Sequence, residues 1–161
     1  PSGANTQPWF FSVVTKPEIK KEIRIQAEVE EKRFYEECAS EQTLNDLKPF
    51  GTNWQKPHLE EASALIVIFA KNFDYMNDSK KKCYYPKESV GIATGFLLFS
   101  LHQLGFATLT HTPQPMTFLN RILDRPFNEK PFLILAIGKA HPDYNAPDLR
   151  KIEFEKTCTF M

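Results

Sequence analysis

Two short, uninterrupted apolar runs constrain the fold of this chain more than any other feature. They lie at residues 64–70 (ALIVIFA) and 132–137 (FLILAI). Each run is shorter than a typical globular helix and lacks the alternation of a strand with one face in water. A continuous apolar run of this length is typical of a buried strand. The sequence therefore predicts a sheet flanked by helices.

Further elements are expected around these runs. Two more strands are predicted, at residues 10–14 and 106–110. Three helices are predicted, at residues 17–39, 86–105 and 118–123. Proline opens the first two of these helices, as helices prefer at their first turn. The second is apolar nearly all round, so we expect it to be central or at a subunit interface. The sum is a single α+β domain over residues 1–161.

Three segments carry no strong periodicity. Residues 40–58 are polar and contain turn-forming residues, so we expect a mobile loop with one helical turn near Leu44. A loop of this length inside a compact domain is usually functional, and we interpret it as an active-site lid. Residues 142–161 are predicted to form an extended C-terminal arm. The polar loop with the lysine run at residues 80–82 is expected to be a solvated turn, in preference to a phosphate site.

Charge and cysteine content exclude several classes of function. The 20 Lys and Arg residues balance the 20 Asp and Glu residues, so nothing favours nucleic acid as a partner. The three cysteines are widely spaced and fit neither a zinc site nor a disulfide framework. We therefore expect no metal, and free thiols in a reducing compartment such as the cytoplasm.

Two groups of small polar residues are candidate site elements. Ser2, Gly3 and Ala4 place backbone N–H groups beside a predicted strand, where they could cradle an anion or a ring edge. The alternative is a loop that only turns the chain. The residues 110–112 (THT) end a predicted strand, a common position for binding residues. The alternative there is a set of hydroxyls that only satisfy the strand end.

A third group combines opposite charges. Glu31 and Tyr35 are four residues apart and share a helix face, and Lys56 lies in the predicted lid. Together they would suit a zwitterion, with Glu31 binding its ammonium and Lys56 its carboxylate. The alternative is a solvated acidic helix face, because the same helix carries several other glutamates.

Five motifs occur along the chain in a defined order and spacing. They are PSGANTQPW at 1–9, TNW followed by Lys56, KKKCYY at 80–85, THTP at 110–113 and APDLRK at 146–151. In these motifs the chain resembles the iodotyrosine deiodinase branch of the nitroreductase superfamily, with small insertions or deletions near Tyr85 and Met116. The Glu31, Tyr35 and Lys56 set points to that branch in particular.

The resemblance implies a fold, a reaction and partners. The fold would be nitroreductase-like, with a mostly antiparallel or mixed central sheet flanked by helices, in a homodimer that exchanges its arms. FMN would be the cofactor and NADPH the ultimate reductant, directly or through a separate flavin reductase. The reaction would be reductive dehalogenation of mono- and diiodotyrosine to tyrosine and iodide. The alternatives are a broad-specificity nitroreductase or quinone reductase and a non-catalytic flavin-binding homologue.

The resemblance also implies roles for individual residues. Substrate would be bound by the Ala4 backbone N–H, which would meet the phenolate, and by Glu31, Tyr35 and Lys56. Thr112 would act as the catalytic residue, because its hydroxyl would lie near flavin N5 and favour one-electron steps. The residues that would contact FMN are Pro1, Ser2, Gly3, Thr110, His111, Thr112, Arg150 and Lys151, the last two at its phosphate.

Two departures from the pattern affect these expectations. An Arg-rich phosphate-binding motif lies upstream of the PSG turn in the family, so we expect residues 1–161 to lack an N-terminal part of the flavin site. A membrane anchor would also lie in such a segment. His111 stands where other members often have Thr, which matters little if only backbone contacts are made there.

Overall fold

A four-stranded antiparallel sheet forms the centre of the computed structural model, which describes residues 1–76, 79–145 and 147–161. Its strand order is β1-β2-β6-β5. The strands are β1 (Trp9–Val14), β2 (Ala64–Lys71), β6 (Glu129–Gly138) and β5 (Ala107–His111). All four were predicted from the sequence, and their ends differ from the prediction by at most three residues. The two apolar runs form the central strands β2 and β6, which explains why they are apolar throughout.

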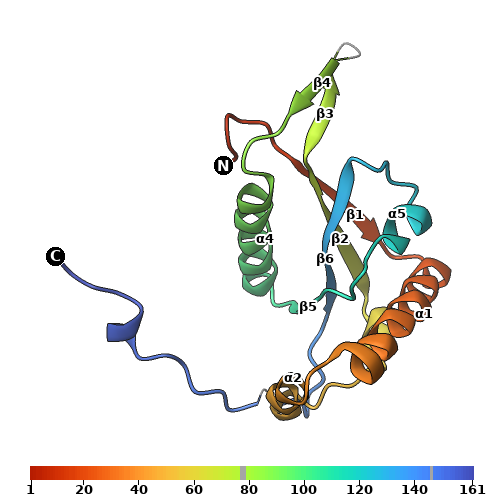
Figure 1. The fold of residues 1–161 in the computed structure, drawn as a ribbon. Helices are drawn as coiled ribbons and strands as arrows, with labels where there is room; N and C mark the ends of the chain where they lie inside the picture. The colour runs from red at the N-terminus through yellow and green to blue at the C-terminus, as the bar shows by residue number, and fades with distance from the viewer. Residues whose placement is uncertain (77–78, 146) are drawn as a thin grey trace.

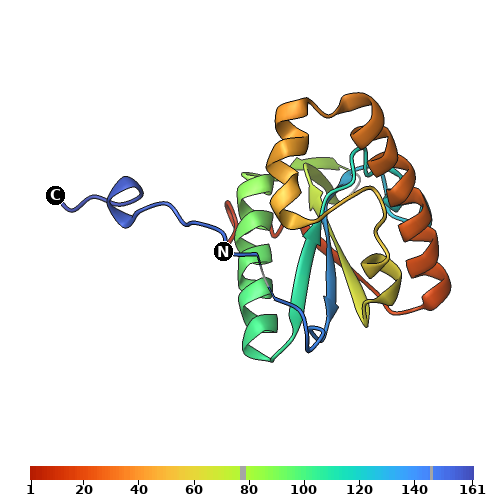
Figure 2. The same cartoon turned by 90° about the horizontal axis from the view of Figure 1, so that it is seen from below.

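Helices cover both faces of this sheet, as Figure 2 shows with α1 and α4 on opposite sides. The helices are α1 (Pro17–Arg33), α2 (Glu41–Leu47), α3 (His58–Glu61), α4 (Pro86–Gln103) and α5 (Phe118–Ile122). Leu65, Val67 and Phe69 of β2 pack in the cluster that includes α1, α3 and α5. Ile68 and Ala70 point the other way and pack against Val90 of α4. The alternation of side chains along β2 therefore serves two cores.

The segment at 40–58 differs from the prediction of a loop. Residues 41–47 form α2, a 3-10 turn follows at Lys48–Phe50, and α3 begins at His58. The Ser40 hydroxyl caps α2 by accepting the Thr43 N–H at 3.1 Å. This N-cap explains the helix, because a serine before a helix satisfies one of its free amides. The first long helix is not α-helical throughout. Its α-helical part ends at Arg33, and a π-helical turn covers Phe34–Cys38.

The prediction of a polar loop around the lysine run was wrong. Ser79–Lys82 is strand β4, which pairs with β3 (Phe73–Met76) in an antiparallel hairpin. Residues 77–78 lie outside the described residues. The side chain of Lys80 crosses the strand pair and places its Nζ 3.7 Å from the centre of the Phe73 ring. Lysine is tolerated on such an edge because its stem packs while its charge stays in water.

Helix α4 presents two apolar stripes, only one of which is covered. Val90, Thr94 and Leu97 face the sheet, whereas Ile92, Phe96 and Phe99 are exposed. The C-terminal arm extends away from the body, with one short 3-10 turn at Phe154–Lys156 (Figure 1). No helix in the described part of the chain is both long and apolar enough to cross a membrane.

Candidate functional site

Glu31, Tyr35 and Lys56 come together beside the C-terminal end of α1. Glu31 lies in its last turn and Tyr35 in the π-helical turn that follows. Lys56 approaches from the segment before α3, and its Nζ lies 3.1 Å from Glu31 Oε2. The same Nζ lies 5.6 Å from the centre of the Tyr35 ring. The side chains of Glu31 and Lys56 are only 14% and 6% exposed, so this part of the helix is not a solvated acidic face.

Several local contacts hold Lys56 in place. Its ammonium donates to Thr52 Oγ1 at 3.0 Å and to the Asn53 carbonyl oxygen. Its backbone N–H donates to Glu28 Oε1 at 2.8 Å, which ties the segment to α1. Glu28 and Glu31 lie one helical turn apart on the same face of α1. The carboxylate of Glu28 binds the Lys56 backbone, and the carboxylate of Glu31 binds its ammonium.

Two histidines complete this cluster, and only one of them was predicted. His111 Nε2 lies 3.7 Å from Glu31 Oε1, and the His111 ring meets the His58 ring edge to face with centres 5.7 Å apart. Burial, with the charge of Lys56 and the neighbouring His58, lowers the pKa of His111 to about 3. Burial and Lys56 also lower the pKa of His58. Both rings are therefore neutral at pH 7, because a buried imidazole disfavours its charged form.

No signal in the sequence marks His58 as a site residue. It follows Lys56 by two positions and begins α3, and only the packing of α3 against α1 brings it to His111. The Nε2 atoms of His58 and His111 are buried, and neither has a hydrogen-bond partner among the described residues. Buried polar atoms without partners are rare in folded proteins and often mark a ligand site.

A cavity of about 760 Å³ opens beside this cluster. This volume lies within the range of about 300–1,000 Å³ that is typical of small-molecule sites. Its lining includes Phe50, Lys56, His58, Thr110, His111 and Tyr144. Glu31 and Tyr35 do not line it. A ligand in the cavity would therefore meet Lys56 and the two histidines before it met Glu31.

Thr110, His111 and Thr112 are adjacent in the sequence, but β5 places the side chains of Thr110 and His111 on opposite faces of the sheet. His111 pairs with Ile134, which packs in the α1 core, so His111 faces α1. Thr110 pairs with Leu135 and faces the α4 side, because paired residues of antiparallel strands share a face. Thr110 and Thr112 are exposed. His111 therefore belongs with Glu31 and Lys56, whereas the side chain of Thr110 lies on the other face of the sheet, although Thr110 also lines the Lys56 cavity.

The opening turn at residues 1–4 lies against the start of α4. The Gly3 N–H donates to the Ser89 hydroxyl at 3.2 Å, and Gly3 forms a bridge with Tyr84. The Ser2 hydroxyl accepts the Gln7 N–H at 3.0 Å. Four non-glycine residues of this region have left-handed backbones: Ala4, Asn5, Gln7 and Tyr85, with φ between 46° and 53°. Such conformations cost free energy and often occur at ligand sites.

Within one chain the predicted site residues do not form a single site. Figure 1 shows the opening turn above the start of α4, and α2 beside the Lys56 segment at the opposite end of the body. Arg150 and Lys151 lie on the arm, where Arg150 Nη2 contacts Glu153 Oε1 at 3.1 Å. Within the described residues the predicted site residues thus lie in separate groups, one with Ser2 and Gly3 and one with Lys56.

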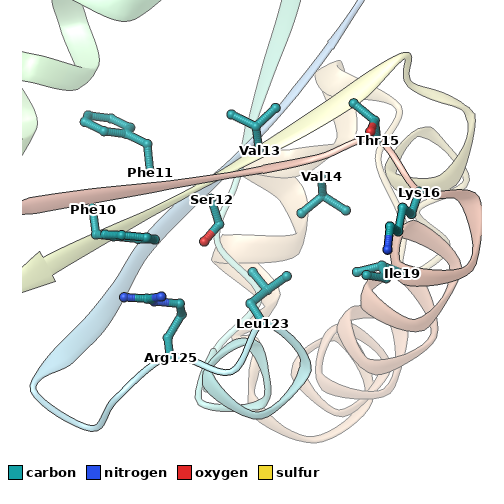
Figure 3. A pocket seen from close by; sticks show the side chains of 10 residues that line it. All are labelled: Phe10, Phe11, Ser12, Val13, Val14, Thr15, Lys16, Ile19, Leu123 and Arg125. Carbon is teal, nitrogen blue, oxygen red and sulfur yellow. The ribbon is translucent and has the colours of Figure 1, made fainter.

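A second cavity, of about 340 Å³, follows the outer edge of β1 (Figure 3). Phe10, Ser12 and Val14 point into it, and the Arg125 guanidinium stacks 3.6 Å from the centre of the Phe10 ring. Arg125 is also held by two contacts to the buried Glu129, at 2.7 and 3.0 Å. None of the residues proposed for the site lines this cavity, and the charge of Arg125 is already paired with Glu129.

A model of the nitroreductase family matches residues 1–139. The chain belongs to the nitroreductase family. Among its relatives is an iodotyrosine deiodinase from Haliscomenobacter hydrossis, which is 52% identical over 152 residues, covering 94% of this chain and 68% of that protein. Iodotyrosine deiodinases from Daphnia pulex and Homo sapiens are 40% and 39% identical, over 94% of this chain. The chain spans about half the length of these two animal proteins, 51% and 53%.

Solved structures place this nitroreductase-family chain in the same fold. It matches a structure of oxidised iodotyrosine deiodinase bound to FMN and 3-iodo-L-tyrosine with a TM-score of 0.83 and 29% identity, covering 99% of this chain and 81% of that one. It also matches a BluB-like flavoprotein from Clostridium difficile 630 with a TM-score of 0.71, 20% identity, and coverage of 100% and 83%. The nitroreductase-like fold expected from the sequence is thus confirmed.

Proposed function

We propose that this protein is an FMN-dependent reductase that removes iodide from mono- and diiodotyrosine, leaving tyrosine. The observation that carries the proposal is the buried pair of Glu31 and Lys56, 3.1 Å apart beside Tyr35, with Lys56 in the wall of a cavity of ligand size. A buried anion and a buried cation are the complement of an amino-acid zwitterion. The identity of 52% with a bacterial iodotyrosine deiodinase supports the same substrate class.

The residues present include the hydrogen-bond donors and the cations that FMN requires. A flavin ring needs hydrogen-bond donors at its edge, and its phosphate needs cations. Hydroxyls of Ser2, Thr110 and Thr112 and the N–H groups beside Pro1 and Gly3 would serve the ring and ribityl chain. Arg150 and Lys151 on the arm would meet the phosphate, since guanidinium and ammonium bind phosphate well. His111 faces the Glu31 cluster instead, so we place its side chain at the substrate.

The protein's own groups would position and activate the substrate. FMN, when bound, would supply two electrons, so that the carbon–iodine bond breaks, a proton adds to the ring carbon and iodide leaves. The Ala4 N–H would hold the phenolate oxygen, which favours the ionised phenol. The Thr112 hydroxyl would donate to the flavin and favour one-electron steps. Closure of residues 40–58 as a lid would exclude water from the site. NADPH would be the ultimate reductant, directly or through a separate flavin reductase.

We further propose that two copies of the chain form the complete site. The opening turn lies at the start of α4, and α2, whose Leu47 lines the Lys56 cavity, lies at the opposite end of the body (Figure 1), so a second copy is needed to bring them together. The exposed stripe of Ile92, Phe96 and Phe99 on α4 offers a self-complementary surface. The arm leaves the body and exposes Phe154 and Phe160, as expected for a segment that packs on a partner.

A titration tests this function directly. The FMN-loaded protein is titrated with 3-iodo-L-tyrosine while flavin fluorescence is followed, and iodide release is then measured with a chemical reductant. Saturable quenching with release of one iodide per monoiodotyrosine supports the deiodinase. Turnover of nitroaromatics without binding of iodotyrosine would identify a broad nitroreductase or quinone reductase. Reduction of FMN without turnover of any acceptor would identify a non-catalytic flavoprotein.

A further inference from the structure

A stripe of charged side chains on α1 binds α3 and the residue before it. Its members are spaced four residues apart, which places them on one face of the helix. They are Lys20, Arg24 and Glu28. The Lys20 ammonium donates to the Glu60 carbonyl oxygen at 2.9 Å and to the Ala62 carbonyl oxygen. The Arg24 guanidinium bridges Glu28 Oε1 at 3.0 Å and Glu60 Oε2 at 2.8 Å. The end of α3 is therefore fixed to α1.

Glu28 extends this attachment to the backbone of Lys56. Its Oε1 accepts the Lys56 N–H at 2.8 Å, and Lys56 is only 5% exposed. The side chain of Glu28 is 15% exposed, and a hydrogen bond shielded from water in this way is stronger than one in solvent. Arg24 binds the same oxygen of Glu28. The carboxylate therefore cannot turn away from Lys56 without also breaking an ion pair.

The preceding part of the segment at 40–58 is attached less firmly. No residue of α2 is buried, and the side-chain hydrogen bonds there join residues within 40–48. Residues 52–53 are attached through the ammonium of Lys56. The Trp54 ring meets an exposed side chain of α1, that of Lys32, with Nζ 5.7 Å from the ring centre. A segment with few buried contacts opens at a low cost in free energy. Among the described residues, the firm attachment to α1 therefore begins at Lys56.

We propose that Glu28 is a positioning residue that fixes the hinge of the lid at Lys56. Residues 40–55 move when a ligand enters, whereas Lys56 and His58 stay in the wall of the 760 Å³ cavity. Glu28 does not line that cavity. It acts through Lys56, because it holds the backbone from which the Lys56 ammonium reaches the ligand. The inference rests on the proposed function, in which Lys56 binds the substrate.

Hydrogen exchange of single amides, followed by NMR on the FMN-loaded protein, tests the position of the hinge. Without ligand, the Lys56 amide should exchange at least about tenfold more slowly than the amides of α2, because it is buried and bonded to Glu28. Saturating 3-iodo-L-tyrosine should slow exchange in α2 by about tenfold or more and that of Lys56 by less than about threefold. A Lys56 amide that exchanges as fast as those of α2 would place Lys56 in the moving part. Exchange in α2 that the ligand leaves unchanged would contradict closure of 40–55.

Two substitutions at Glu28 test its role in binding. Glu28→Ala removes the acceptor of the Lys56 N–H, whereas the amide oxygen of Glu28→Gln can still accept it. The dissociation constant and the KM for 3-iodo-L-tyrosine should rise about tenfold or more in Glu28→Ala, with kcat within about threefold. Glu28→Gln should stay within about threefold of the wild type in all three values. FMN affinity should change by less than about twofold in both variants, because Glu28 acts only through Lys56.

Glu22→Ala is the matched control. Glu22 lies on the same helix, its side chain is half exposed, and its Oε1 lies 3.4 Å from Arg121 Nη1 of α5. An exposed pair contributes little, so each value should stay within about twofold of the wild type.

The contrary outcomes are distinguishable. Unchanged iodotyrosine affinity in Glu28→Ala overturns the positioning role, and so does an equal loss of iodotyrosine and FMN binding, which a general loss of stability would produce. A Glu28→Gln variant as weak as Glu28→Ala also overturns it, because the acceptor would then not matter. If Glu28→Ala does not fold, the exchange pattern of the wild type decides by itself. A wild type that binds no iodotyrosine overturns the proposed function, whereas exchange at Lys56 without ligand still tests the hinge.

Discussion

The Gly3 N–H donates a hydrogen bond to the Ser89 hydroxyl at 3.2 Å, although 86 residues separate the two in the chain. Ser89 is 2% exposed and lies in the first turn of α4. The backbone of Gly3 approaches so closely that a Cβ there would lie 2.7 Å from the Tyr84 carbonyl oxygen and 2.9 Å from the Tyr85 ring. The opening turn is therefore held against α4 by a contact that only glycine allows.

Gly3→Ala should displace this turn. The new methyl group would meet backbone atoms that cannot move aside, so the Gly3 N–H would lose its acceptor, at a cost of about 1–3 kcal/mol. We expect a lower free energy of unfolding in urea and weaker binding of FMN. Gly138→Ala is the control, because a Cβ there would lie 3.8 Å from Ser63, an ordinary contact. Equal behaviour of the two variants would show that the turn tolerates a side chain.

The free energy of unfolding should decrease as the pH is lowered, because the pKa of His111 is lowered in the folded chain. Burial first, and then the charge of Lys56, lowers its pKa to about 3, below the ordinary value of 6.5. Between these values the unfolded chain binds a proton that the folded chain does not, so unfolding becomes easier as the pH falls. The contribution is complete above pH 6.5 and is lost towards pH 3, with a slope of at most about 1.4 kcal/mol per pH unit.

Urea unfolding between pH 4 and 8 measures this slope. His111→Gln should reduce the slope of the free energy of unfolding with pH. Part of the slope should remain, because the pKa of His58 is also lowered. His141→Gln should leave the slope as it is, because the side chain of His141 is 75% exposed. A slope that is the same in His111→Gln and in the wild type would mean that the pKa of His111 is not lowered in the folded chain.

Phe96→Glu should prevent self-association through α4. Phe96 is 64% exposed in one chain, and burial of a phenylalanine contributes about 1.5–3 kcal/mol. A twofold interface buries it twice. The dissociation constant of the dimer should therefore rise at least about 100-fold, measured by sedimentation, and FMN content should fall with it. Val29→Glu is the control, since Val29 is similarly exposed on α1. A Phe96→Glu protein that remains dimeric would place the interface elsewhere.

Thr112→Ala should shift the flavin from one-electron towards two-electron chemistry. The hydroxyl is exposed directly after β5, where it could donate to a bound flavin. One hydrogen bond contributes about 0.5–1.5 kcal/mol, so one-electron-reduced flavin should fall roughly two- to tenfold in a reductive titration with a tyrosine analogue bound. Thr108→Ala, on the same strand, is the control. Unchanged accumulation in Thr112→Ala would remove Thr112 from the catalytic role.

Local sequence patterns determined the elements that frame the site. Pro17 and Pro86 are the first residues of α1 and α4, because proline suits the first helical position and its missing N–H costs nothing there. The four-residue spacing of Glu31 and Tyr35 placed them one helical turn apart. The hairpin β3–β4 was missed, and α2 was expected only as one helical turn near Leu44. The lysines of β4 and the polar residues of α2 have the composition of a loop. What makes these segments a strand and a helix is the cross-strand pairing and the Ser40 cap, which are contacts between residues and do not appear in the composition.

What the sequence determined by itself is the covered sheet, the two long helices and the residue types of the site, because these depend on periodicity over neighbouring residues. The tertiary structure decided which of those residues meet. The register Thr110↔Leu135 and His111↔Ile134 places adjacent residues of one motif on opposite faces of the sheet. The packing of α3 against α1 brings His58 to His111, and chain closure over 25 positions pairs Lys56 with Glu31. Such contacts depend on how distant elements pack, and no local pattern encodes them.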